Sequence, residues 1–175
     1  RRFIKKMNEI SKMLEYQSTV LLIGKKSADV AYTVYKEYKS TIKDSNCKYI
    51  TLCADDTVFS NYSKISKIKE EILNRELLFH DLKIGNIDKY NKLAEKHQQL
   101  NELKHIVINV SNYKQLISNM QDSNKACIKE FKDALNTIYA LGRSDGVRLI
   151  ISSDVKPSKD DLGSALAMLD MITLD

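Results

Sequence analysis

The sequence has 175 residues, a net charge of +5, and hydrophobic and charged contents of 43% and 29%. A chain of this length can bury one sizeable core, and this composition is that of an ordinary globular protein. No apolar run approaches the roughly 20 residues that span a bilayer, and no signal peptide is visible. Because the chain opens on Arg1 rather than Met, we expect residues 1–175 to form a single domain excised from a longer protein.

The distribution of charge and the few cysteines and histidines bear on which kinds of site the chain can carry. The positive excess is spread along the chain, which favours a solvated lysine-rich surface, although a phosphate or nucleic-acid surface stays open until the charges are placed in space. The odd cysteine count predicts reduced thiols, and Cys47 and Cys53 should face the same side of one strand and be packed rather than reactive. The three histidines lack metal-ligand spacing and receive no catalytic role. They are His80, His97 and His105.

The first half of the chain reads as helix, strand, helix, strand. Apolar periodicity predicts helices over Arg1–Tyr16 and Ala28–Ile42, and β-branched or continuous apolar runs predict strands over Thr19–Gly24 and Cys47–Ala54. Asp55 and Asp56, which close the second strand, are expected to form a turn and a helix N-cap rather than a metal site.

A long amphipathic helix is predicted over Lys64–Leu82, followed by a second helical piece over Asn86–Gln99. The buried stripe of the first is expected to contain Ile65, Ile68, Ile72, Leu73, Leu77 and Leu78, and its solvent face Lys67, Glu70, Glu71 and Arg75.

The second half continues the alternation. Strands are predicted over Lys104–Val110, Val147–Ser153 and Met171–Leu174. Helices are predicted over Ser123–Leu141 and Leu162–Leu169, and Gly142–Gly146 is expected to be a turn. Alternating strands and helices specify a mostly parallel sheet covered on both faces, so the expected fold class is a three-layer α/β/α sandwich.

The junction after the first strand is where a phosphate-binding loop would lie. A P-loop needs several glycines, then Lys and Ser/Thr at the helix start. Here the segment is Gly24-Lys25-Lys26-Ser27-Ala28-Asp29, with one glycine and an acidic residue that repels phosphate. The pattern favours a plain strand–helix turn with solvated lysines.

The polar corner that follows Lys104–Val110 is the other half of such a site. A nucleotide hydrolase places an acidic pair there, one carboxylate for Mg²⁺ and one to position water. This chain has Ser111 and Asn112, which are uncharged and cannot act as general bases near neutral pH.

Several segments, in order, resemble FtsK/SpoIIIE-type ATPases, and together they span about half the chain. One stretch contains a helix with Arg-x-x-Leu-Phe followed by Gly, Asn, Ile, Tyr and Asn. Its matching positions are Arg75, Leu78, Phe79, Gly85, Asn86, Ile87, Tyr90 and Asn91. Segment 106–116 resembles the Walker B strand and its tail, and segment 141–151 resembles the Leu-Gly-Arg-x-x-Gly block before the last core strand. The resemblance implies a RecA-like P-loop NTPase fold.

The departures from that family are concentrated in the nucleotide site. On this alignment Val30 and Ala31 take the places of the Walker A Lys and Ser/Thr. Ser111 and Asn112 take those of the Walker B acids, and Asp154 that of the polar sensor Gln. These losses imply a catalytically inactive domain that has no metal site and needs no cofactor. ATP and Mg²⁺ would bind only if the degenerate site still holds them. The predicted remnant of the site comprises Gly24, Lys25, Lys26, Ser27, Ser111, Asn112 and Asp154.

The last ATPase domain of type VII secretion motors of the EssC kind is similar in having degenerate nucleotide motifs. The resemblance implies a cytoplasmic domain of a bacterial membrane protein, acting in substrate recognition or regulation of protein export. Its implied partners are secreted proteins, neighbouring ATPase domains of the same chain and further copies of itself in a homo-hexamer, with nucleic acid not expected. Two alternatives stay open. One is an active ATP-dependent DNA translocase using Lys25, Lys26 and Ser27. The other is a small α/β binding domain of flavodoxin or receiver topology, which strand order would distinguish.

Overall fold

The computed structural model describes residues 1–42 and 46–174, so the three residues before Asn46 and the last residue lie outside the described part. The described residues form an α/β domain with a five-stranded sheet in which every pairing is parallel. The strands are β1 (Thr19–Ile23), β2 (Cys47–Cys53), β3 (His105–Ser111), β4 (Val147–Ser153) and β5 (Met171–Thr173). The helices are α1 (Arg2–Gln17), α2 (Ser27–Thr41), α3 (Val58–Leu82), α4 (Ile87–Lys96), α5 (Tyr113–Ser123), α6 (Lys125–Asp145) and α7 (Lys159–Leu162), with a 3-10 turn at Leu166–Met168.

The strand order is β2-β3-β4-β1-β5, so β4 lies between β1 and β3. In the flavodoxin and receiver topology the first strand pairs directly with the third. Here β1 pairs with β4, with Thr19 opposite Leu149, and β3 pairs with the other edge of β4, with Ile106 opposite Val147. The flavodoxin or receiver alternative is therefore wrong, and the inserted strand is the one expected of a motor ATPase.

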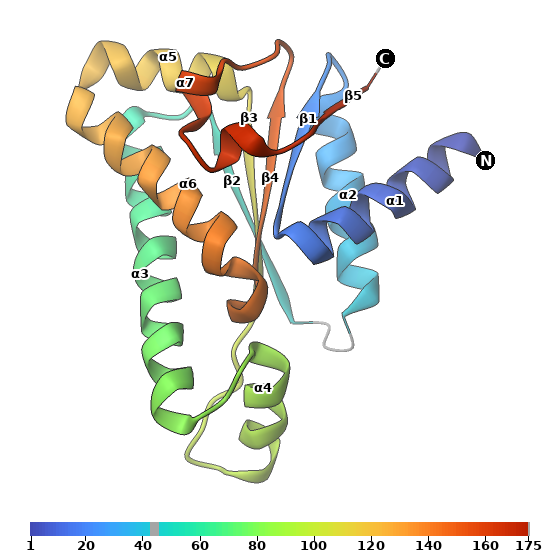
Figure 1. Ribbon diagram of the computed structural model, residues 1–175, viewed down its shortest axis with the longest axis vertical. Helices are drawn as coiled ribbons and strands as arrows, with labels where there is room; N and C mark the ends of the chain where they lie inside the picture. The colour runs from blue at the N-terminus through green and yellow to red at the C-terminus, as the bar shows by residue number, and fades with distance from the viewer. Residues whose placement is uncertain (43–45, 175) are drawn as a thin grey trace.

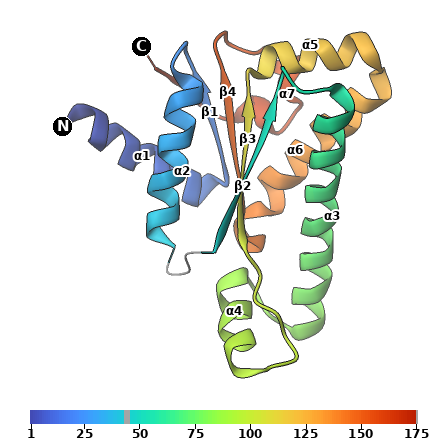
Figure 2. The same cartoon turned by 180° about the vertical axis from the view of Figure 1, so that it is seen from behind.

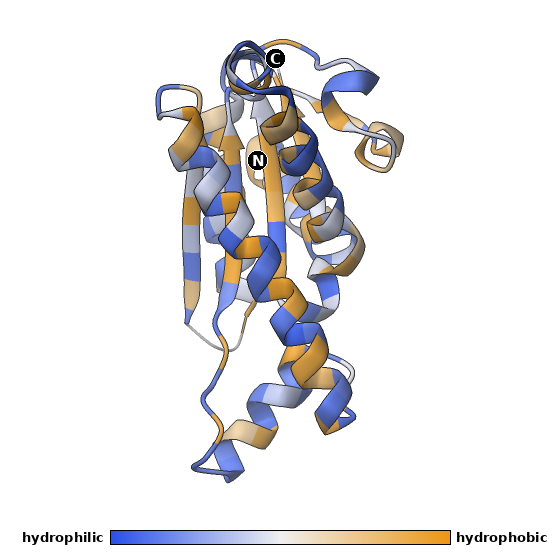
Figure 3. Ribbon diagram, turned by 90° about the vertical axis from the view of Figure 1, so that its left-hand side faces the viewer, coloured by the Kyte–Doolittle hydropathy of each residue, from blue (hydrophilic) through white to orange (hydrophobic). Residues whose placement is uncertain are grey.

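Helices cover both faces of the sheet, which confirms the predicted three layers (Figures 1 and 2). On one face α1 and α2 enclose a cluster that includes Leu14, Leu22 and Val34. On the other, α3, α5 and α6 pack over a larger cluster that includes Ile72, Ile108 and Phe131. Every residue of β1 and β4 is buried, which explains the continuous apolar run of β1. In Figure 3 the central strands carry long orange stretches, and the surrounding helices alternate between blue and orange along their length.

The helix α3 differs from its prediction at its start and in its buried face. It begins at Val58 because the Thr57 side chain accepts a hydrogen bond from the Ser60 amide, an N-cap that apolar periodicity does not report. Leu73 and Leu77, expected to be buried, are 46% and 64% exposed, whereas Arg75, expected in solvent, is only 3% exposed. Both corrections have one cause: the helix turns its Arg75 side toward α6 and the start of β3.

The segment after β3 is more helical than predicted. In the segment that resembles the Walker B tail, Ser111 ends β3 and α5 begins at Tyr113, and α6 continues through the residues expected to form a turn. Only Gly146 leaves the helix, with φ of 77° at the C-cap. Gly142 is buried within α6, and a Cβ there would lie 2.4 Å from the Val147 carbonyl oxygen. That glycine therefore serves close packing of helix on strand, not chain reversal.

The helical segments near the C-terminus also differ from the prediction. Instead of one helix over Leu162–Leu169 there is the short α7, capped by Ser158 and Asp161, and then the 3-10 turn. Gly163 separates them with φ of 83°, a conformation that ends a helix. The predicted last strand is confirmed as β5, which pairs with β1 through Leu21 opposite Met171.

The residues that carry the family resemblance in the 75–91 stretch build one corner of the fold. Asn86 caps α4 by accepting from the Lys89 amide at 2.9 Å. Asn91 pairs with both backbone groups of Leu103, donating at 3.0 Å and accepting at 2.9 Å. Phe79 and Tyr90 pack ring to ring at 5.6 Å. These contacts hold α4 and the segment before β3 against the end of α3, so the matched positions are structural.

Two whole-chain features complete the fold. All three cysteines carry free thiols, and burial raises the pKa of Cys47 to about 11, so this thiol is packed and protonated, as predicted. Among the described residues, the helices are too short or too polar to traverse a bilayer.

Candidate functional site

The predicted site residues gather at the carboxyl edge of the sheet. Gly24 follows β1, Ser111 ends β3, and Asp154 follows β4. Because these three strands are adjacent and parallel, their ends meet at the same edge, at the top of the sheet in Figure 1. The structure therefore brings together the three groups of remnant residues that lie far apart in the sequence.

The connection from β1 to α2 is a closed turn. The Ser27 amide donates to the Gly24 carbonyl oxygen at 3.1 Å, and α2 begins at Ser27 itself. Lys25 and Lys26 are exposed at the tip, while Ser27 is buried at 1% exposure. A phosphate cradle needs a longer loop that turns several amides inward. In this turn only Lys25 and Lys26 separate Gly24 from the helix, so no such loop exists.

Gly24 is required here for packing rather than for a phosphate. Its φ is +138°, and a Cβ would lie 2.2 Å from the Leu174 carbonyl oxygen. The chain after β5 is fastened at this point, because the Leu174 amide donates to the Ile23 carbonyl oxygen at 2.8 Å. Residues at the end of β5 therefore occupy the space directly against the β1–α2 turn.

The positions aligned with the Walker A Lys and Ser/Thr lie inside the fold. Val30 and Ala31 are 7% and 0% exposed and belong to the apolar cluster between α1, α2 and the sheet. An apolar side chain there stabilises the contact of α2 with its neighbours, and neither position could present a cation or hydroxyl to a ligand at the sheet edge.

The corner after β3 is equally neutral. Asn112 is exposed, with φ of 49°, and its side chain makes no capping hydrogen bond to α5. The next residue, Tyr113, is fully buried, and its hydroxyl donates to the Asp161 carbonyl oxygen. Burial raises the pKa of Tyr113, so this hydroxyl is a structural donor and not an acid or base.

The third group, at the end of β4, contributes one exposed carboxylate. Asp154 is exposed, and the preceding Ser153 hydroxyl donates to the Val155 carbonyl oxygen at 2.7 Å. Across the described ranges 1–42 and 46–174, no cluster of three or more His, Cys, Asp or Glu side chains could hold a metal ion. The edge thus offers lysine ammoniums, a hydroxyl, an amide and one carboxylate, a set suited to polar contacts with a partner.

A buried polar pair below this edge was missed by the sequence reasoning. Asn109 and Ser152 are 5% and 0% exposed on neighbouring strands, and the Ser152 hydroxyl lies 3.4 Å from the Asn109 side-chain oxygen. Asn109 also hydrogen-bonds Tyr49, whose pKa burial raises to about 12. The available signal was a single amide inside an otherwise apolar run.

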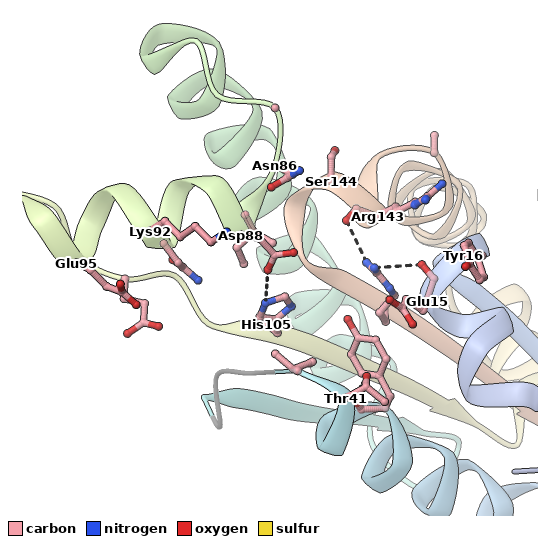
Figure 4. A pocket seen from close by; sticks show the side chains of 18 residues that line it. Glu15, Tyr16, Thr41, Asn86, Asp88, Lys92, Glu95, His105, Arg143 and Ser144 are labelled. Atoms are coloured by element: carbon pink, nitrogen blue, oxygen red, sulfur yellow. Dashed lines mark hydrogen bonds and ion pairs between the residues drawn. The ribbon is translucent and has the colours of Figure 1, made fainter. Parts of the chain in front are cut away.

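A hollow lies at the opposite, amino edge of the sheet, between α4 and the ends of α1 and α2 (Figure 4). Its volume is about 1080 Å³. His105, which received no role from the sequence, is buried there, with Nε2 3.6 Å from an Asp88 carboxylate oxygen. The rim carries both signs of charge, from Glu15, Glu95, Lys92 and Arg143 among others.

Arg148 closes the floor of this hollow and clamps two helices. Its Nη1 donates to the Gly142 carbonyl oxygen at 3.0 Å and its Nη2 to that of Glu15 at 3.2 Å. The guanidinium also lies 5.5 Å from the centre of the Tyr38 ring. Burial lowers the pKa of Arg148, but the carbonyls at the C-terminal ends of α1 and α6 favour a cation there. This arginine is therefore a structural clamp.

The geometry defines a class before any relative is considered. A parallel sheet with β4 inserted between β1 and β3 is the strand order expected of a motor ATPase fold. The sequence matches no protein-family model, and no curated protein matches it.

Solved structures place the fold more closely. The pCW3 conjugation coupling protein TcpA, as a monomer with ATPγS, is similar with a TM-score of 0.67 at 16% identity, over 88% of this chain and 47% of that one. The type VII secretion ATPase EccC of Thermomonospora curvata (ATPases 2 and 3, with a signal sequence peptide) is similar with a TM-score of 0.64 at 13% identity, over 88% and 30%. EssC (ATPases 2 and 3) of Geobacillus thermodenitrificans is similar with a TM-score of 0.56 at 17% identity, over 83% of this chain and 31% of that one.

The chain therefore has the fold of FtsK/SpoIIIE-type ATPase domains, which confirms the predicted RecA-like fold. It spans about half of TcpA and about a third of the EccC and EssC chains.

Proposed function

We propose that this is a non-catalytic FtsK/SpoIIIE-type domain of a type VII secretion motor that acts in substrate recognition or regulation of export. The observation that carries the proposal is the closed Gly24–Ser27 turn, where the Ser27 amide bonds the Gly24 carbonyl oxygen. A phosphate-binding loop would have to keep its amides free for the triphosphate. The domain keeps the fold of the motor ATPases but lacks the loop that would bind the triphosphate of the nucleotide.

The chemistry at the neighbouring strand ends supports the same proposal. Hydrolysis needs a cation on the phosphates, a Mg²⁺ ligand and a group that positions water. Here Val30 and Ala31 are buried in the apolar core, and Ser111 and Asn112 stand at the end of β3 without a negative charge. Loss of all of these functions removes most of the electrostatic stabilisation of the transition state.

The partners and location in this proposal follow from the motors of similar fold. We infer secreted proteins and neighbouring ATPase domains of the same chain as partners, with a homo-hexamer as the candidate assembly. In this proposal the domain works on the cytoplasmic side of a bacterial membrane protein, and nucleic acid is not a partner. The edge formed by Gly24, Lys25, Lys26, Ser111, Asn112 and Asp154 is the candidate contact surface.

Calorimetry with Mg·ATP tests the absence of a nucleotide site. The domain should give no saturable heat at millimolar nucleotide and no hydrolysis above a protein-free control. Lys26→Ala and Lys25→Ala variants serve as a matched pair, and both should behave as the parent does. Saturable hydrolysis that disappears in Lys26→Ala would overturn the proposal.

The DNA translocase alternative has its own measurement. Titration of double-stranded DNA at several salt concentrations should give no binding near physiological ionic strength. Strong binding whose logarithm falls steeply with log salt would instead indicate neutralised phosphates and would favour a translocase.

A further inference from the structure

A second hollow, unrelated to the predicted nucleotide edge, runs over the outer side of α6. Its volume is about 780 Å³, and it lies between Lys69 of α3 and the 163–165 loop that follows α7. The residues that line it include Leu141 and Ala165 as well as Lys129, Lys132 and Asp133. We call this surface the α6 groove.

One side of the α6 groove is built rigidly by Asn136. The Asn136 side-chain oxygen accepts from the amides of Ala165 and Leu166 at 3.2 and 3.3 Å, and its nitrogen donates to the Lys132 carbonyl oxygen at 2.7 Å. A Cβ on Gly163 would lie 2.8 Å from the same nitrogen, so the loop approaches α6 as closely as a glycine allows. The wall of the groove is therefore formed before any partner arrives, which lowers the cost of binding.

The charge of the groove is strongly one-sided. Three ammonium groups line it and only one carboxylate does. The Lys132 ammonium donates to the Asp160 carbonyl oxygen at 2.5 Å. Within the described ranges no carboxylate lies within ion-pair distance of Lys69 or Lys129, whereas Lys64 elsewhere on α3 does have one, at Asp56. The groove consequently has positive charge available for an external partner.

Apolar surface accompanies this charge. Leu141, Ala140 and Ala165 contribute to the lining. Lysines accommodate carboxylates without the fixed fork that an arginine imposes, so the combination suits side chains of alternating acidic and apolar character.

We propose that the α6 groove docks an acidic segment of a partner polypeptide, with carboxylates on Lys69, Lys129 and Lys132 and apolar side chains on Leu141 and Ala165. This docking site rests on the proposed function, because it takes the partner to be a polypeptide rather than a nucleotide or nucleic acid. It adds a location distinct from the carboxyl edge of the sheet and a chemical class of ligand.

The test uses fluorescence anisotropy with a labelled synthetic peptide of alternating glutamate and leucine. The parent chain should bind it saturably. The double variant Lys69→Glu/Lys129→Glu should weaken binding by about tenfold or more through like-charge repulsion. The matched double variant Lys25→Glu/Lys26→Glu makes the same charge change at the carboxyl edge and should stay within about twofold of the parent.

A gain-of-affinity variant guards against misfolding as an explanation. Asp133→Asn removes the one carboxylate on the groove and should tighten peptide binding by about twofold, which no unfolded protein would do. Equal weakening by both double variants, or an unchanged affinity in Lys69→Glu/Lys129→Glu, overturns the proposal. Tighter binding of tripolyphosphate or of a single-stranded oligonucleotide at the same lysines overturns it in favour of a polyanion site.

The outcome is separable from that of the nucleotide test. Turnover of ATP would overturn the proposed function and leave the lysine dependence of peptide binding as measured. Loss of that dependence would overturn the docking site and leave the nucleotide result unchanged.

Discussion

The guanidinium of Arg75, in the middle of α3, donates a hydrogen bond of 2.6 Å from Nη1 to the carbonyl oxygen of Asp145, the last residue of α6. Its Nη2 donates to the Lys104 carbonyl oxygen at 2.9 Å, and its Nε pairs with Glu71 at 2.9 Å. One side chain thus joins α3, the C-terminal end of α6 and the start of β3. A cation at the end of a helix is also favoured by the helix dipole.

Replacing Arg75 should destabilise the fold strongly. Arg75→Ala leaves two carbonyl oxygens without their donor in a site that is 3% exposed, and we expect a loss of about 3 kcal/mol in the free energy of unfolding. Urea denaturation measures it. Arg143→Ala is the matched control, because Arg143 is exposed and lies only against the Tyr16 ring at 5.7 Å; its cost should stay below about 1 kcal/mol. Similar losses in both variants would contradict the structural role of Arg75.

Asp145 makes stability depend on pH in an unusual direction. Its pKa is raised from 3.8 to about 8, chiefly by burial and additionally by the nearby Glu76 carboxyl, while Arg75 opposes the increase. Between these two pKa values the folded state holds a proton that the unfolded state has released. Stability should therefore fall as the pH rises from about 4 to about 8 and level off above that.

Asp145→Asn should remove this slope. We expect the variant to be more stable than the parent at pH 8, by about 1 kcal/mol or more, with the gap closing toward pH 4. Denaturant midpoints at several pH values give the two curves. Parallel curves would show that Asp145 titrates alike in both states.

Gly24→Ala should destabilise the β1–α2 turn. The new methyl group would meet the Leu174 carbonyl oxygen at 2.2 Å, in a backbone conformation with φ of +138°. We expect a cost of about 2 kcal/mol. Gly85→Ala is the control, because nothing lies within 4 Å of its Cβ position; it should change stability by less than about 1 kcal/mol. A tolerated Gly24→Ala would mean that the end of β5 can move away from the turn.

Asn91→Ala should loosen the segment before β3 rather than the whole core. The Asn91 side chain hydrogen-bonds both the amide and the carbonyl oxygen of Leu103, as a neighbouring strand would. Its loss leaves this donor and acceptor unpaired, and we expect it to cost about 2 kcal/mol of local stability. Limited proteolysis should show faster cleavage between α4 and β3. Asn74→Ala, at an exposed position of α3, should leave the cleavage rate unchanged, and equal rates in both variants would contradict the local effect.

The sequence determined the class of fold because its signals there are local. Continuous apolar runs become strands with both faces covered, as in β1, and a period near 3.6 becomes a helix, as in α6. Alternation then requires parallel strands joined by crossovers. The absence of a glycine-rich loop after β1, and of acids after β3, could likewise be read directly from the residues.

What only the tertiary structure decided depends on which side of a helix meets which neighbour. The helical pattern predicts that Arg75 faces solvent. In the structure its side chain is buried and donates hydrogen bonds to two carbonyl oxygens from distant segments. Leu77 reads as core and is exposed, because α3 has no further layer against that side. The α6 groove brings together Lys69, Lys129 and the 163–165 loop. Such long-range pairings leave no period in the sequence, since they depend on how the packed layers meet.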